Sequence, residues 1–275
     1  MRRLSVAVLV SALLVLALGA PASAVTNGGP DGDNHPYVGL LVFDDENGPA
    51  WRCTGALLSP TLVLTAGHCT DGAVAARLWL DEVVQGNPEY PFSGTTSYDG
   101  VPYTYPGYTS PGDGLVGFSY GDVGVVVLSE PVPTEVVSTY ADLPSANLVA
   151  GLPKGTTVDF VGYGVQYQAQ IKGKDLPQPP PYYRWTGVKD RMYSYGSLLS
   201  GNFRISDDVI KVTMNPGGGS GGTCFGDSGG PDLLGGTDTV LAVNSFVTNV
   251  NCGGVGYDTR VDLPERLAWI NGFLP

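Results

Sequence analysis

Short apolar segments separated by glycine and proline run through the whole chain and limit its possible folds more than any other feature. Segments such as 37–43, 62–66 and 240–247 are rich in β-branched and aromatic residues and are short enough to be single strands. No long amphipathic repeat interrupts them, and the 275 residues include 40 glycines. The pattern predicts an all-β chain of many short strands, large enough to bury one big core or two small ones.

The N-terminus predicts export. Arg2 and Arg3 precede an apolar run from Val6 to Leu18, and the small residues Ala22-Ser23-Ala24 follow. This order is typical of a secretory signal peptide, and the run is shorter than the ~20 apolar residues of a membrane-spanning helix. We expect residues 1–24 to be removed and the rest to be secreted and extracellular. The formal charge of −12 argues against nucleic acid or anionic membranes as partners.

Four cysteines fit an oxidising compartment. Cys53, Cys69, Cys224 and Cys252 allow three disulfide pairings, and the residues alone do not choose among them. A zinc site is the rival interpretation. Because the chain has no Cys-x-x-Cys pair and only two histidines, we expect no metal.

A serine crowded by glycines is the candidate nucleophile. Ser228 lies in the run Gly-Asp-Ser-Gly-Gly-Pro from Gly226 to Pro231. Glycines allow a sharp turn and a close approach to substrate, and the amides of Gly226 and Ser228 could converge on a developing oxyanion. A flexible Gly/Ser loop is the alternative, and it suits residues 215–221 better than this run.

A serine nucleophile needs a base, and the chain offers two histidines. His35 lies in a turn before a proline, whereas His68 ends a predicted strand beside Cys69. Asp122 stands at the head of a strongly apolar strand, where a carboxylate could orient the base or simply cap a turn. Asp113, in a glycine turn, is the fallback for that role.

These motifs resemble those of chymotrypsin-like serine proteases. Gly-Asp-Ser-Gly-Gly-Pro is similar to the family's nucleophile loop, and Thr-Ala-Gly-His-Cys at 65–69 to its histidine motif, with Gly67 where Ala is commoner. The resemblance covers Val25 to Leu274. It implies two six-stranded antiparallel β-barrels packed face to face, about 25–135 and about 147–262, and a short C-terminal α-helix at about 263–273.

The resemblance also implies a mechanism. Ser228 would attack a peptide carbonyl to form an acyl-enzyme, His68 would take and return the proton, and Asp122 would orient His68. The amides of Gly226 and Ser228 would form the oxyanion hole. The substrates would be proteins or peptides, no metal or organic cofactor is implied, and we expect a monomer.

The family pattern pairs Cys53 with Cys69 and Cys224 with Cys252. A catalytically inactive homologue that acts as a secreted binding protein is the alternative function. Because the candidate serine, histidine and aspartate all stand intact, we favour catalysis.

The substrate pocket differs from that of trypsins. Trypsins carry Asp six residues before the nucleophile, where this chain has Gly222, so a basic side chain would lack its counter-charge. Ser245-Phe246-Val247 resembles the elastase pocket wall, in which Val narrows the entrance. The resemblance predicts small or medium apolar residues before the scissile bond, with an aromatic preference as the alternative. The candidate pocket residues are Gly222, Thr223, Ser245, Phe246 and Val247.

Activation is expected to accompany export. In the family, a new Ile or Val N-terminus pairs with the Asp that precedes the catalytic Ser, which here is Asp227. Val25 directly follows the predicted cleavage site, so one cut would release the protein and expose the Val25 ammonium.

Overall fold

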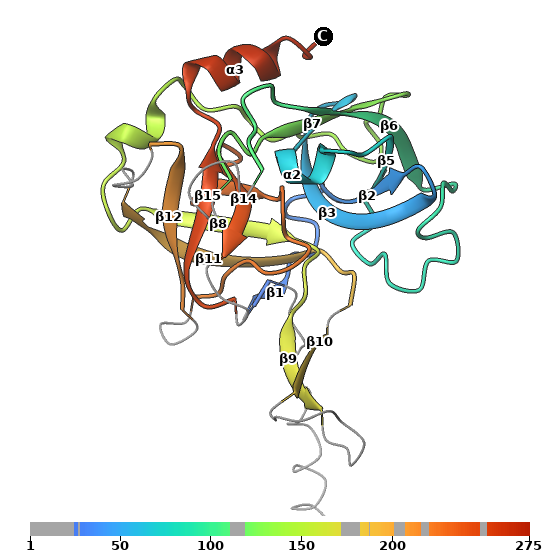
Figure 1. The fold of residues 1–275 in the computed structure, drawn as a ribbon, viewed down its shortest axis with the longest axis horizontal. Coiled ribbons are helices and arrows are strands. Elements are labelled where there is room, and N and C mark those ends of the chain that lie inside the picture. The colour runs from blue at the N-terminus through green and yellow to red at the C-terminus, as the bar shows by residue number, and fades with distance from the viewer. Residues whose placement is uncertain are drawn as a thin grey trace, which may run out of the picture.

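The computed structural model describes residues 25–26, 28–110, 119–171, 182–186, 188–200, 207–215, 220–247 and 252–275. Within this part of the chain, two closed antiparallel β-barrels lie side by side and a short C-terminal helix packs across the top in Figure 1. The predicted fold class is therefore confirmed. The predicted signal peptide lies outside the described residues. No helix among those described is long and apolar enough to cross a membrane.

The first barrel has the strand order β2-β3-β4-β7-β6-β5 and closes by pairing β5 with β2. Nearly every residue of β2 and all of β4 are buried, because the barrel interior covers one face and the second barrel covers part of the other. Its strands are β2 (Val38–Asp45), β3 (Gly48–Ser59), β4 (Leu62–Thr65), β5 (Ala75–Trp79), β6 (Ser97–Thr104) and β7 (Gly124–Leu128).

The second barrel has the order β11-β12-β15-β14-β13-β8 and closes by pairing β8 with β11. Its strands are β8 (Thr157–Gly162), β11 (Met192–Ser200), β12 (Val209–Met214), β13 (Pro231–Leu234), β14 (Val240–Val247) and β15 (Gly254–Arg260). A separate two-stranded ribbon of β9 (Tyr167–Ile171) and β10 (Tyr182–Thr186) extends from the lower side in Figure 1. The proline-rich segment 172–181 between them lies outside the described residues.

The N-terminal segment joins the second barrel rather than the first. Strand β1 (Gly29–Pro30) pairs with β11, and Val25 is fully buried in the core of the second barrel. The guanidinium of Arg191 donates to the buried Asp31 carboxylate at 3.1 Å. His35 Nδ1 lies 2.6 Å from the same carboxylate, so a short contact with Asp31 fixes the half-buried His35 in its turn. The first few described residues, which the predicted bounds of about 25–135 group with the first barrel, therefore pack on the second barrel.

The C-terminal helix holds the two barrels together. Helix α3 (Pro264–Asn271) lies within the predicted range of about 263–273, begins at a proline in its first turn, and buries Leu267 and Ile270. Trp269 packs edge-on against Tyr105, a residue of the first-barrel half of the chain, with 5.4 Å between the two ring centroids. A short 3₁₀ helix, η1 (Leu148–Gly151), follows the connection between the barrels.

Candidate active site

One helical turn between the barrels carries the candidate base. Strand β4 ends at Thr65, and α2 (Gly67–Thr70) follows immediately with His68 as its second residue. A Cβ on Gly67 would lie 3.1 Å from the Tyr108 ring and from the backbone of Val123. The missing side chain therefore lets α2 approach the chain at Val123, and this explains glycine where the family more often has alanine.

That close approach brings His68 against Asp122. Asp122 is fully buried, and its Oδ1 accepts the His68 amide at 2.7 Å. Its Oδ2 lies 2.8 Å from His68 Nδ1, so the carboxylate holds both the backbone and the ring of the histidine. The fallback residue Asp113 lies outside the described residues.

A third donor reaches the same carboxylate from the second barrel. The Ser245 hydroxyl donates a hydrogen bond to Asp122 Oδ2. Burial would by itself raise the pKa of Asp122, but the charge of His68 and the hydrogen bonds from His68 and Ser245 outweigh it and lower that pKa. Burial would likewise lower the pKa of His68, and the neighbouring Asp122 charge reverses this and raises it. Sequence reasoning assigned Ser245 to the pocket wall and missed this contact.

The loop that carries Ser228 is fixed by a residue of the first barrel. Thr54, on β3, donates its amide to the Ser228 carbonyl at 2.8 Å and its hydroxyl to the Gly226 carbonyl at 2.8 Å. The backbone N–H groups of Gly226 and Ser228 have no hydrogen-bond acceptor among the described residues. Gly226 has φ +98°, which residues with a Cβ rarely adopt, so glycine is required for this loop conformation. No sequence motif surrounds Thr54, so sequence reasoning could not have identified it as a residue that holds the serine loop.

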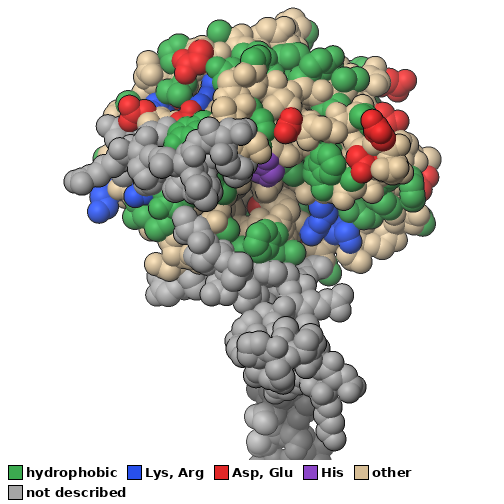
Figure 2. Space-filling model, in the orientation of Figure 1, with side chains coloured by type: hydrophobic (Ala, Val, Ile, Leu, Met, Phe, Trp, Pro, Cys, Tyr) green, Lys and Arg blue, Asp and Glu red, His purple; other side chains and the backbone are tan. Residues whose placement is uncertain are grey.

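His68 and Ser228 line one cleft between the barrels, together with Trp51, Arg52, Cys53 and Asp71. Figure 2 shows the hollow that opens on this face of the molecule. The disulfide Cys53–Cys69 joins β3 to α2 directly behind the histidine, and the second disulfide joins Cys224 to Cys252, as the resemblance implied. The cysteine sulfurs near His68 are bonded to each other, so they are not thiolate ligands for a metal.

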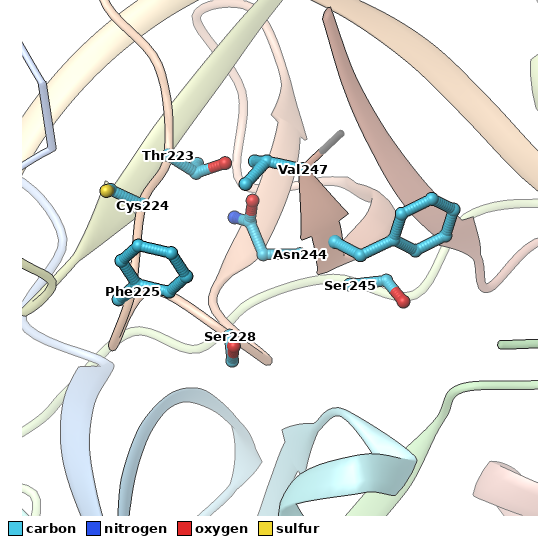
Figure 3. A pocket seen from close by; sticks show the side chains of 8 residues that line it. Thr223, Cys224, Phe225, Ser228, Asn244, Ser245 and Val247 are labelled. Carbon is cyan, nitrogen blue, oxygen red and sulfur yellow. The ribbon is translucent and has the colours of Figure 1, made fainter. Parts of the chain in front are cut away.

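A second cavity of about 180 Å³ opens beside Ser228. Four of the five predicted pocket residues line it, and Figure 3 shows these walls meeting around Asn244. The lining residues are Thr223, Cys224, Phe225, Ser228, Asn244, Ser245, Phe246 and Val247. Gly222 does not line it. A Cβ on Gly222 would lie 2.6 Å from Met214 Cβ, so this glycine packs against β12. Asn244 was missed, although it directly precedes the wall that the sequence identified.

The candidate activation residues lie in the second barrel. Asp227 is fully buried, and its carboxylate accepts the amides of Gly164 and Cys224 at 2.8 Å each. Burial raises the pKa of Asp227 to about 7, against the lowering effect of those hydrogen bonds. Thr26 pairs with Gly222, which fixes the chain next to Val25 close to the segment that leads into the serine loop.

A pair of buried carboxyl groups lies behind the serine loop. Asp232 on β13 and Asp258 on β15 are both buried, and burial raises the pKa of each above its ordinary value. The contact with Asp258 adds to the rise at Asp232, whereas the hydrogen bonds from Asp232 and from the Ser245 amide only partly offset the rise at Asp258. We call these two residues the buried carboxyl pair. Asp258 Oδ1 also accepts the Ser245 amide at 3.2 Å, so the pair supports the residue that contacts Asp122.

Comparison with known proteins agrees with this geometry. The Trypsin family model matches residues 28–270. The chain is 27% identical to Serine protease 1 of Drosophila melanogaster over 83% of this chain and 77% of that protein. It is 25% identical to Brachyurin of Leptuca pugilator, with 86% and 91% covered, and 26% identical to Chymotrypsin-like elastase family member 1 of Bos taurus, with 89% and 87% covered.

Solved structures share the fold. The HL collagenase structure superposes with a TM-score of 0.66 at 20% identity, covering 92% of this chain and 96% of that one. A mutant of human heparin binding protein superposes with a TM-score of 0.62 at 18% identity, covering 91% and 96%. Two antiparallel barrels with a histidine, an aspartate and a serine between them define the class of trypsin-like serine proteases. The chain belongs to the Trypsin family.

Proposed function

We propose that the protein is a secreted, monomeric serine endopeptidase that cleaves peptide bonds through an acyl-enzyme. The observation that carries the proposal is the contact of 2.8 Å between His68 Nδ1 and the buried Asp122 carboxylate, at the edge of the cleft that Ser228 also lines. This contact leaves the other ring nitrogen of His68 to serve as the base. A deprotonated Nε2 accepts the serine proton during attack and returns it to the leaving amine.

The rest of the site supports the same chemistry. The free amides of Gly226 and Ser228 are available to donate to the oxyanion that forms when the serine attacks. The low pKa of Asp122 keeps it ionised beside the imidazolium that forms in the transition state. Neither step needs a metal or an organic cofactor.

The cavity beside Ser228 supports a substrate preference. The eight described residues that line it carry no charged side chain, so Lys and Arg before the scissile bond would lose their hydration without a counter-charge from this part of the cavity. Val247 and the small cavity volume favour small or medium side chains over large aromatic ones.

Labelling with a serine-directed phosphonate tests the proposal. Wild type should be modified at Ser228 and lose activity, whereas Ser228→Ala should neither be labelled nor cleave peptides. Ser220→Ala is the matched control, because Ser220 is half-buried away from the cleft and its hydroxyl donates to the Asn215 carbonyl, its one hydrogen bond among the described residues. A folded wild-type protein that neither reacts nor cleaves would instead support the inactive homologue.

Export and activation form a further part of the proposal. We expect the mature chain to begin at Val25, whose ammonium would pair with Asp227. Mass spectrometry of the secreted protein would determine its N-terminus. A mature chain that begins elsewhere, or one with extra residues that is equally active, would contradict this part.

A further inference from the structure

The floor of the cavity beside Ser228 carries a polar side chain without a full set of partners. Asn244, on β14, is only 3% exposed, and its Oδ1 is buried without a hydrogen-bond partner among the described residues. Its Nδ2 donates a long hydrogen bond of 3.4 Å to the Gly230 carbonyl. Figure 3 shows the amide of Asn244 facing the cavity between Thr223 and Val247.

The backbone of Asn244 is held in place, which fixes the point from which its side chain enters the cavity lining. The backbone N–H of Asn244 donates to the Gly230 carbonyl at 2.9 Å, and the backbone carbonyl of Asn244 accepts the Gly229 N–H at 2.8 Å. These two bonds fix its backbone to the end of the serine loop. A buried acceptor without a donor is unfavourable, so the cavity as built is complementary to a ligand that brings a donor.

Thr223 places a second polar group on the opposite wall. Its side chain is buried in the lining of the same cavity, and Figure 3 shows its hydroxyl directed into the space that Asn244 faces. No hydrogen bond of this hydroxyl is found among the described residues. A hydroxyl can donate as well as accept, whereas Asn244 Oδ1 can only accept.

These two groups match one kind of side chain. A carboxamide would donate its N–H to Asn244 Oδ1 and accept from the Thr223 hydroxyl through its carbonyl oxygen. An apolar side chain of equal size would fill the cavity but leave Asn244 Oδ1 without a donor. A hydroxyl side chain has one oxygen, too short to span both walls. A Lys or Arg cation would meet no carboxylate among the described lining residues.

We propose that the cavity selects a neutral carboxamide side chain, glutamine above all, before the scissile bond, with Asn244 and Thr223 as its specificity-determining residues. This inference rests on the proposed endopeptidase function. It narrows the proposed preference for small or medium side chains before the scissile bond to a polar side chain. This replaces the apolar preference that the resemblance to elastases predicted.

Two peptides that differ only before the scissile bond test the inference. Gln and Met are unbranched and similar in size, so their ratio of kcat/KM isolates the hydrogen bonds. Wild type should favour the Gln peptide by roughly tenfold or more, because a buried site with polar groups discriminates strongly against a substrate that leaves them unpaired. In Asn244→Leu the ratio should fall to about one, and in Thr223→Val it should fall roughly threefold.

Val136→Ala is the control, because Val136 is an exposed apolar side chain on the connection between the barrels and is not among the described residues that line the cavity. Its Gln-to-Met ratio should match that of wild type. A wild-type enzyme that cleaves the Met peptide as well as the Gln peptide would overturn the inference, and so would a ratio that survives both Asn244→Leu and Thr223→Val. Cleavage of neither peptide, without phosphonate labelling, would overturn the proposed function instead.

Discussion

An ammonium at Val25 should remove a strong pH dependence of stability that the uncleaved chain carries. With residues ahead of Val25, the fully buried Asp227 carboxylate has two backbone amides as hydrogen-bond donors and no ion pair among the described residues. Arg52 is the nearby positive charge that acts on it, and burial still raises its pKa to about 7.

The size of the effect follows from linkage. In the unfolded chain this carboxyl ionises near its ordinary pKa of 3.8, so between about pH 4 and 7 only the folded state keeps its proton. The folded state therefore loses stability as pH rises through this range. A difference of about three pKa units corresponds to about 4 kcal/mol, lost by about pH 8. In a chain of this size that is a fall in Tm of roughly 10 °C.

Urea unfolding at pH values from 4 to 7.5 would measure this difference. Two proteins are compared, one that begins at Val25 and one that keeps Ala22-Ser23-Ala24, both with Ser228→Ala to prevent self-digestion. The stability of the extended form relative to the Val25 form should fall by about 4 kcal/mol as pH rises, because the ammonium keeps Asp227 ionised and paired in the shorter chain.

The Asp227→Asn variant of the extended form is the control, and it should lack this component of the pH dependence. Parallel curves for the two N-termini would refute the reasoning, since they would mean that the Val25 ammonium does not reach Asp227. A pH dependence that persists in Asp227→Asn would assign the effect to another group.

Three further predictions concern the site and its supports. Asp122→Asn should reduce kcat by roughly 10⁴-fold, the loss seen in the family template. It should also move the acid limb of the pH profile of kcat/KM to lower pH, because His68 loses the neighbouring charge that raises its pKa. An acid limb that does not move would contradict this prediction. Replacing Cys53 and Cys69 together by Ala should destabilise the protein by roughly 3 kcal/mol in denaturant unfolding, since the disulfide closes a loop of moderate length, with sequence separation 16. Asp232→Asn should raise the Tm relative to wild type more at pH 8.5 than at pH 5. The reason is that the raised pKa values of the buried carboxyl pair make the wild type lose stability as pH rises. Equal Tm shifts at both pH values would show that the pair does not titrate in this range.

The residue types that carry the chemistry are recognisable along the chain because each depends on its immediate neighbours. The serine loop needs glycine at 226 for its positive φ. This requirement is local to the loop, so it leaves a motif. The many short apolar segments likewise predicted an all-β fold, since strand length and turn residues are local properties.

The partners of those motifs were decided only by the tertiary structure. Thr54 reaches Gly226 across 172 residues of sequence, and Ser245 reaches Asp122 across 123. The unpaired Oδ1 of Asn244 and the packing of residues 25–26 and 28–30 on the second barrel also result from the tertiary structure. Each depends on how strands far apart in sequence pair and on which face of the sheet a side chain lies. A one-residue change of register would move that side chain to the other face. The sequence alone therefore identified the candidate groups for catalysis, whereas the packing of the two barrels decided which residues hold them and which groups face the cavity.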